Sequence, residues 1–105
     1  MIIYNPNAGG GGQDKSSDIS DYLNLRKIQF EIYKTTKIMD AFYYVRDVLN
    51  LEDVSALACC GGDGSIHEVT NGMMHRKDKQ KVPIAYLPNG SGNDCARAFH
   101  LENID

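Results

Sequence analysis

Residues 61–65 (GGDGS) join a glycine-rich turn to one carboxylate and one hydroxyl, a combination that suits phosphate chemistry. Glycines let the backbone approach a ligand closely, and the free N–H groups at the start of a following helix favour an anion. A carboxylate beside bound phosphate is repulsive unless it holds a bridging divalent metal or accepts a proton from an attacking hydroxyl. Asp63 therefore belongs either to a phosphate site or to an ordinary exposed Asp-Gly turn.

The residues around this turn predict a buried strand before it and an amphipathic helix after it. Val54 to Cys60 is a continuous run of small and apolar residues, the pattern of a strand that is buried on both faces. After the turn, apolar residues recur at helical spacing at Ile66, Val69 and Met73. Ser65 and Glu68 have the spacing of a capping box, which predicts that Glu68 folds back onto the helix start.

A second glycine turn follows at residues 87–97 (LPNGSGNDCAR). The apolar run Val82–Leu87 precedes it, and Ser91 and Asp94 again have capping-type spacing. Because the carboxyl ends of parallel strands share one edge of a sheet, we expect both turns to lie side by side at that edge. Open α/β sheets bind their ligands there, so the repetition favours a phosphate site over two unrelated turns.

Elsewhere the chain alternates strand and helix patterns. We expect a strand at Met1–Tyr4, a glycine-rich loop at 5–12, a helix over Asp14–Leu25 and an alternating strand over Lys27–Lys34. Such alternation predicts one α/β domain with a mostly parallel sheet.

The clearest amphipathic helix follows, with Thr35 or Thr36 as its expected cap. We expect its apolar stripe to form core, and the stripe comprises Ile38, Ala41, Phe42, Val45, Val48 and Leu49.

Composition narrows the class of protein. A chain of 105 residues with 42% hydrophobic and 24% charged residues is typical of one soluble globular domain. A net charge of −3 argues against a nucleic-acid partner, and we expect the basic run Arg76–Lys81 to be a solvated loop. Cys59 and Cys60 lie in the predicted buried strand without metal-ligand spacing, which favours a reducing compartment and therefore the cytoplasm. No apolar run reaches the length of a membrane span, so any membrane contact would be peripheral.

Three motifs resemble the catalytic domain of the diacylglycerol kinase family: NPNAGGG from Asn5, GGDGSIHEVTNG from Gly61 and LPNGSGNDCAR from Leu87. This family of lipid kinases includes diacylglycerol, sphingosine and ceramide kinases and bacterial relatives. The resemblance runs from Asn5 to about Leu101, with the motifs in the family's order and spacing. It covers the N-terminal half of such a kinase, and we expect the family's C-terminal β-sandwich domain, which helps to bind lipid, to be absent.

The resemblance implies a three-layer α/β domain over residues 1–105, similar to NAD kinase and phosphofructokinase. It implies ATP and Mg²⁺ as cofactors and transfer of the γ-phosphate to a lipid hydroxyl such as that of diacylglycerol. Asp63 would be the catalytic base or the metal ligand. The candidate nucleotide-binding residues are Asn5, Asn7, Thr35, Gly61, Gly62, Asp63, Gly64, Ser65, Glu68, Gly90, Ser91, Gly92, Asn93 and Asp94. A plain helix cap explains Thr35 equally well, and a capping box explains Glu68 equally well.

Two other functions fit the same glycine turns. One is a nucleotide-binding module without turnover. The other is a soluble kinase of the NAD-kinase or phosphofructokinase type, although NPNAGGG and GSGND argue against it. Ser65 and Ser91 replace the threonines that are commonest in the family, and each keeps the hydroxyl.

Overall fold

The computed structural model describes residues 1–6, 14 and 16–87. Its elements, in chain order, are β1 (Ile2–Tyr4), α1 (Ser16–Leu25), β2 (Ile32–Lys34), α2 (Asp40–Tyr43), the π-helical turn η1 (Tyr44–Val48), β3 (Leu57–Cys60), α3 (Asp63–Met74) and β4 (Ile84–Leu87). No helix within the described ranges combines the length and apolar character needed to cross a membrane.

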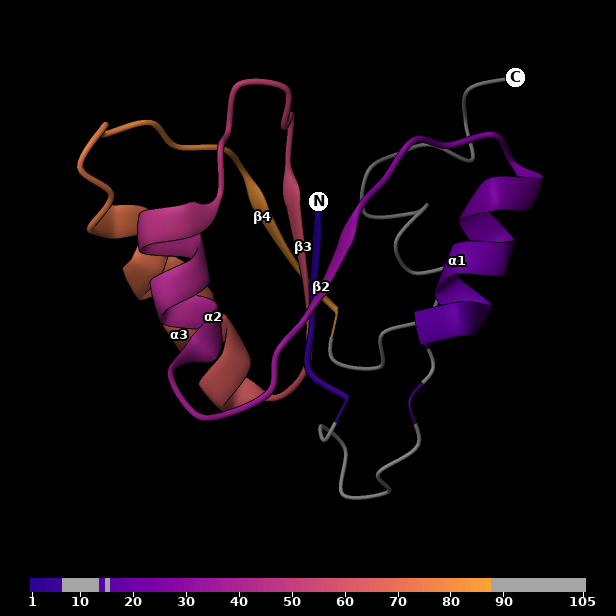
Figure 1. Ribbon diagram of the computed structural model, residues 1–105, viewed down its shortest axis with the longest axis horizontal. Coiled ribbons are helices and arrows are strands. Elements are labelled where there is room, and N and C mark those ends of the chain that lie inside the picture. The colour runs from indigo at the N-terminus through magenta and orange to yellow at the C-terminus, as the bar shows by residue number, and fades with distance from the viewer. Residues whose placement is uncertain (7–13, 15, 88–105) are drawn as a thin grey trace.

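The strands form one sheet in the order β2-β1-β3-β4, and every pair of neighbours is parallel. Figure 1 shows α1 on one face of the sheet and α2 and α3 on the other, which makes three layers. The predicted three-layer α/β class is therefore confirmed. From β1 the chain continues outward to β2, whereas from β3 it continues outward to β4 on the opposite side. The strand order thus reverses between β1 and β3, and this switch point is where open α/β sheets bind ligands.

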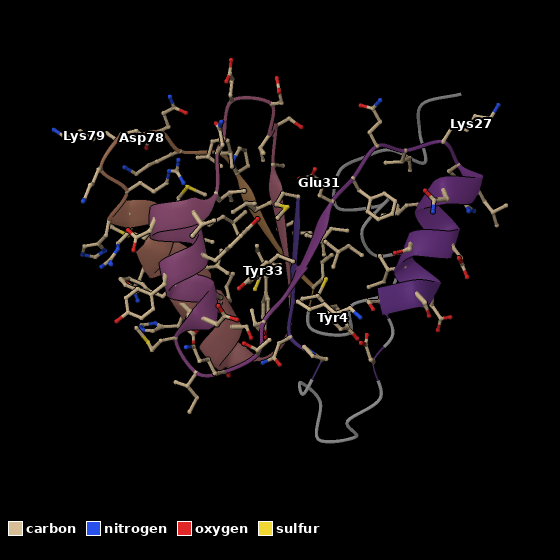
Figure 2. The ribbon with its side chains drawn as sticks, in the orientation of Figure 1. Tyr4, Lys27, Glu31, Tyr33, Asp78 and Lys79 are labelled. Carbon is tan, nitrogen blue, oxygen red and sulfur yellow. The ribbon has the colours of Figure 1, made fainter. Side chains whose placement is uncertain are left out.

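The two central strands bury side chains on both faces. Ile3, Leu57 and Cys59 belong to the core that α2, η1 and α3 cover, while Ile2 and Ala58 belong to the core beneath α1. Figure 2 shows Tyr4 and Tyr33, from neighbouring strands, turned toward opposite faces of the sheet. Burial on both faces explains the continuous apolar run before the glycine turn. The regular strand is shorter than predicted, because pairing with β4 begins at Leu57 opposite Ile84.

Cys59 and Cys60 are both buried, as predicted, and neither forms a disulfide. Burial raises the pKa of the Cys59 thiol to about 12, and the negative charge of Glu68 adds to the effect. Cys59 is therefore a core residue with an unreactive thiol.

The strand predicted over Lys27–Lys34 is regular only at its end. Ile28, Phe30 and Ile32 all pack against the core beneath α1, so the predicted apolar side is correct. Pairing with β1 begins at Ile32 opposite Ile2, and the earlier residues therefore lie outside the ladder.

The predicted amphipathic helix exists, but its start and part of its predicted apolar stripe are wrong. The helix begins only at Asp40, and its last part is the π-helical turn η1, in which the Leu49 N–H bonds the Tyr44 carbonyl at 2.8 Å. The wider turn changes the helical period, so Val48 is 68% exposed. Ile38 is 86% exposed because it precedes the helix. Within the predicted stripe, the buried residues are Ala41, Val45 and Leu49.

Neither threonine caps this helix. The Thr35 N–H still bonds the Tyr4 carbonyl at 2.9 Å, which extends the pairing of β2 with β1. A capping Thr36 would accept a hydrogen bond from a backbone N–H of the helix. Instead, the backbone N–H of Thr36 donates to the carboxylate of Asp40, the first residue of the helix, at 2.7 Å. The residue that precedes the helix is Met39, in a left-handed conformation with φ 72°.

Arg76 also departs from the prediction of a solvated loop. It is 8% exposed, and its Nη1 donates to the carbonyls of Val45 and Leu49 at 2.7 and 2.6 Å. Its Nε and Nη2 donate to the Asp78 carboxylate. Arg76 therefore ties the end of η1 to the segment after α3. Residues 77–81 are exposed as predicted, and Figure 2 shows Asp78 and Lys79 on the loop after α3, at the end of the molecule where the strands begin.

Asp14 anchors the start of α1 and predicts a dependence of stability on pH. Its carboxylate accepts from the Ser16 N–H at 2.8 Å and from Lys34 Nζ at 2.9 Å. The hydrogen bonds from Ser16, followed by the contact with Lys34, lower the pKa of Asp14 to about 2. Because the folded-state pKa lies below the ordinary value of 3.8, this stabilisation is complete above pH 4 and is lost as the pH falls toward 2.

We expect urea midpoints between pH 5 and pH 2, measured by circular dichroism, to fall less steeply for Asp14→Asn than for the wild type. Asp53→Asn, at an exposed loop position, serves as the control and should keep the wild-type slope. Equal slopes for Asp14→Asn and the wild type would contradict this role of Asp14.

Candidate functional site

A pocket of about 350 Å³ opens at the carboxyl edge of the sheet. It is lined by residues that follow β1 and β2 and by the first two turns of α3: Asn5, Thr35, Thr36, Lys37, Ile38, Gly64, Ser65 and Glu68. Its volume lies at the small end of the range for small-molecule sites. The sheet's switch point lies between β1 and β3, so Asn5 and the glycine turn meet where the topology favours a ligand. Five predicted nucleotide-binding residues therefore share one pocket.

A direct contact joins the first and second motifs across the switch point. Asn5 Nδ2 donates to Ser65 Oγ at 3.2 Å, and Ser65 is only 9% exposed. Gly61 is buried beside this pair, where an added Cβ would lie 2.6 Å from Ser65 Oγ and 3.3 Å from the Asn5 Cβ. Gly61 thus permits close packing under the pocket.

The next two glycines leave the start of α3 open. A Cβ added at Gly62 or at Gly64 would have no neighbouring atom within 4 Å. Gly62 is the N-cap of α3 and carries no side chain that could bond the N–H groups of the first turn. An anion can therefore approach the helix N-terminus at Gly64, which lines the pocket.

Glu68 does not form the predicted capping box. The N-cap is Gly62, so Ser65 is already the third residue of α3 and Glu68 lies one turn further along. The Glu68 Oε2 instead accepts from the Met39 backbone N–H at 3.1 Å, across the pocket wall. The prediction was wrong because the helix starts two residues before Ser65 and the Ser65 hydroxyl faces Asn5.

Asp63 is the first residue of α3 and is exposed beside the pocket. Its Oδ1 accepts from the Tyr86 Oη at 3.2 Å, so β4 contributes a group that orients the carboxylate. Partial burial, followed by this hydrogen bond, raises the pKa of Tyr86. The role of Asp63 as catalytic base or metal ligand stays a prediction.

In the part of the chain that the structure describes, no three His, Cys, Asp or Glu side chains are grouped as a metal site. Asp63 nevertheless suits Mg²⁺, which commonly takes one or two carboxylates together with substrate phosphates and water. The donor set therefore fits a metal that arrives with a nucleotide.

The turn after β2 forms one wall of the pocket, and most of its residues were not predicted from the sequence to belong to the site. Thr36, Lys37 and Ile38 line the pocket although only Thr35 was predicted there. Their position directly after a parallel strand was the available signal, because such segments lie at the ligand-binding edge. Tyr86 had no comparable signal.

Tyr33 and Asp40 stabilise this turn through a hydrogen bond to one another and through the bond from the Thr36 N–H to Asp40. Tyr33 Oη donates to Asp40 Oδ1 at 2.7 Å, and the Tyr33 ring stacks on Tyr44 with centroids 3.7 Å apart. The hydrogen bond to Asp40 is the main cause that raises the pKa of Tyr33 to about 12. Burial by itself raises the pKa of Asp40, but the hydrogen bonds from Tyr33 and Thr36 outweigh it and lower the pKa.

The rest of the predicted site lies outside the described residues. This applies to the second glycine turn and to one residue of the first loop: Asn7, Gly90, Ser91, Gly92, Asn93 and Asp94.

Comparison with known proteins gives consistent matches over most of the chain. The family model for the diacylglycerol kinase catalytic domain matches residues 1–105. A diacylglycerol kinase of Staphylococcus aureus is 34% identical over 105 residues, which cover 97% of this chain and 32% of the relative. The chain thus spans about a third of the length of the curated relatives it matches.

Solved structures from Bacillus anthracis share the fold. A diacylglycerol kinase structure has a TM-score of 0.62 and 28% identity, over 91% of this chain and 34% of that one. Another structure from the same organism has a TM-score of 0.66 and 27% identity, over 85% of this chain and 31% of that one. The predicted fold, similar to NAD kinase and phosphofructokinase, is therefore confirmed.

Proposed function

Because this chain belongs to the diacylglycerol kinase catalytic-domain family, we propose that it is the nucleotide-binding part of an ATP-dependent lipid kinase. The reaction is transfer of the γ-phosphate of ATP to a hydroxyl of a lipid such as diacylglycerol. The observation that carries this proposal is the pocket at the switch point, where Asn5, Thr35 and Ser65 converge from three separate segments. The protein would work in the cytoplasm and meet its substrate peripherally at a membrane surface.

The geometry favours one placement of the nucleotide phosphates. They would lie against the N-terminus of α3, where Gly62 and Gly64 leave open space and the helix dipole favours negative charge. The Asn5 amide and the Ser65 hydroxyl, already hydrogen-bonded to one another, would orient the phosphates from below. By the family resemblance, the backbone amides of the second glycine turn, Gly90 to Asn93, would also hold phosphates.

Phosphoryl transfer mainly requires positioning and neutralisation of charge on the transferred group. Mg²⁺, if bound with the nucleotide, would supply that neutralisation. The Asp63 carboxylate, next to Gly64 at the start of α3, would hold the metal or accept the proton of the lipid hydroxyl. The Tyr86 hydroxyl donates to one Asp63 oxygen, which leaves the other oxygen for either task.

The acceptor lipid needs a further wall. Transfer requires the hydroxyl, the metal and the γ-phosphate to be aligned in a site that excludes bulk water. The family's β-sandwich domain would supply that wall. We therefore expect residues 1–105 alone to bind nucleotide weakly and to phosphorylate lipid negligibly.

The test measures transfer of labelled phosphate from ATP to diacylglycerol in mixed micelles. Residues 1–105 and a version followed by the family's second domain are compared, and only the longer protein should form phosphatidic acid. Robust lipid phosphorylation by residues 1–105, abolished by Asp63→Asn, would overturn the need for a second domain. Phosphorylation of NAD in place of lipid by the longer protein would favour the soluble NAD-kinase type.

A further inference from the structure

The turn Thr35–Met39, which joins β2 to α2, forms one wall of the pocket and is held at both ends. At its start, the Thr35 N–H pairs with the Tyr4 carbonyl of β1. Below it, Asp40 Oδ2 accepts from the Thr36 N–H at 2.7 Å and from the Thr36 hydroxyl at 3.2 Å. This first half of the turn is therefore fixed to the sheet and to the start of α2.

The second half of the turn has an unfavourable backbone conformation. Met39 has φ 72° and ψ −2°, a left-handed conformation that residues other than glycine rarely adopt. Non-glycine residues keep such conformations where surrounding contacts enforce them, and these places are often ligand sites. Within the described residues, the Met39 N–H donates to the carboxylate of Glu68, whose Oε2 lies at 3.1 Å, and the Met39 carbonyl accepts from the Tyr43 N–H at 3.1 Å.

We propose that Glu68 is a positioning residue that holds the Thr35–Met39 turn against α3. It thereby keeps this wall of the pocket in the position at which the nucleotide can bind. Glu68 reaches the turn from the second turn of α3, 29 residues further along the chain. It lines the same pocket as Thr36 and Ile38, so release of the turn would move the wall that a nucleotide contacts. Glu68 acts here through its hydrogen-bond acceptor and not through a charge that meets the ligand.

This inference rests on the proposed function, because it assigns Glu68 a task in the nucleotide pocket. If the turn is released for part of the time, the apparent dissociation constant rises in inverse proportion to the fraction of molecules with the turn in place. Loss of one hydrogen bond between a backbone N–H and a carboxylate should therefore weaken nucleotide binding about fivefold.

The experiment compares Glu68→Ala with Glu68→Gln in the protein that contains this chain. Glutamine keeps a side-chain oxygen that can accept from the Met39 N–H, whereas alanine does not. Binding of ATP with Mg²⁺ is measured by calorimetry. We expect Glu68→Ala to bind about fivefold more weakly and Glu68→Gln to bind within about twofold of the wild type. Glu52→Ala, at an exposed loop position, removes the same charge as a control and should not change binding.

A second measurement reads the turn without any nucleotide. Hydrogen exchange at the Met39 amide should accelerate in Glu68→Ala and stay near the wild-type rate in Glu68→Gln. Met39→Gly removes the backbone penalty and should restore part of the affinity that Glu68→Ala loses.

Equal loss of binding in Glu68→Gln and Glu68→Ala would overturn the proposal, because the charge itself would then be what matters. An unchanged Met39 exchange rate in Glu68→Ala would overturn it as well. If the wild-type protein binds no ATP, the proposed function is contradicted and the role of Glu68 in the turn is not. The hydrogen-exchange rate of the Met39 amide in Glu68→Ala then decides whether Glu68 holds the turn.

Discussion

Replacing Arg76 by alanine should lower the free energy of unfolding by about 3 kcal/mol, because it removes the donor from a buried and fully bonded cluster. The guanidinium donates to the carbonyls of Val45 and Leu49 at the end of η1, and both bonds are buried. It also pairs with the Asp78 carboxylate at 2.6 Å. Truncation leaves the two buried carbonyls without their donor, and each orphaned group costs about 1–3 kcal/mol when it stays buried. The Asp78 carboxylate is exposed and still accepts from the Gln80 N–H, so it adds little to this cost.

The measurement is urea unfolding followed by circular dichroism. Lys77→Ala, at the next position and exposed, is the matched control and should change stability by less than about 0.5 kcal/mol. Arg76→Lys should lose part of the stability, since one ammonium cannot reproduce the fork of donors. Figure 2 shows that the adjoining Asp78 lies far from the carboxyl edge of the sheet. We therefore expect Arg76→Ala to keep the nucleotide affinity of the wild type under conditions in which it is folded. An Arg76→Ala protein as stable as Lys77→Ala would contradict the structural role.

Replacing Asp63 by asparagine should reduce phosphoryl transfer at least about a hundredfold in the active protein, because a positioned acid or base contributes about 10² to 10⁴ in rate. Asparagine has nearly the same shape, and its side-chain oxygen can still accept from the Tyr86 hydroxyl. The fold should therefore be unchanged, with a free energy of unfolding within about 0.5 kcal/mol of the wild type. The loss should appear in kcat and not in the stability of the protein.

Tyr86→Phe is the control for orientation alone. It removes one hydrogen bond at a partly exposed position, so it should cost the rate only a few-fold, in line with about 1 kcal/mol. A titration with Mg²⁺ separates the two roles of Asp63. If the carboxylate holds the metal, high Mg²⁺ should restore part of the Asp63→Asn rate, whereas a missing base is not restored. Full activity of Asp63→Asn would exclude both roles.

The parts of the fold that the sequence predicted depend on short-range patterns. The run before the glycine turn became β3, and the spacing of Val69 and Met73 placed both residues in the core. Parallel strands bring their carboxyl ends together, so the motifs that follow β1 and β3 could be assigned to one edge. The contact of Asn5 with Ser65 confirms that assignment at the level of side chains.

The errors arose where a contact distant in the sequence decides the local structure. The π-helical turn η1 moves Val48 out of the core, and its end is held by Arg76, some thirty residues away. Glu68 bonds Met39 on another segment because a glycine and not a serine caps α3. Spacing along one helix carries no information on either partner, so the predicted stripe, the solvated Arg76 and the capping box could not be corrected from sequence.

We expect the pocket between Asn5, Thr35 and Ser65 to hold a nucleoside triphosphate, and ligand-induced thermal shift measures such binding. Unfolding is followed with ATP and Mg²⁺, with NAD and without ligand, for the wild type and for Gly64→Val, which places a side chain in the open space at the start of α3. At about one hundred times the dissociation constant, a bound ligand stabilises the folded protein by about 2.7 kcal/mol. We expect ATP with Mg²⁺ to raise the melting temperature of the wild type, NAD to raise it less, and Gly64→Val to lose the ATP response. A larger shift with NAD than with ATP, or an undiminished ATP response in Gly64→Val, would show that this pocket does not bind ATP as proposed.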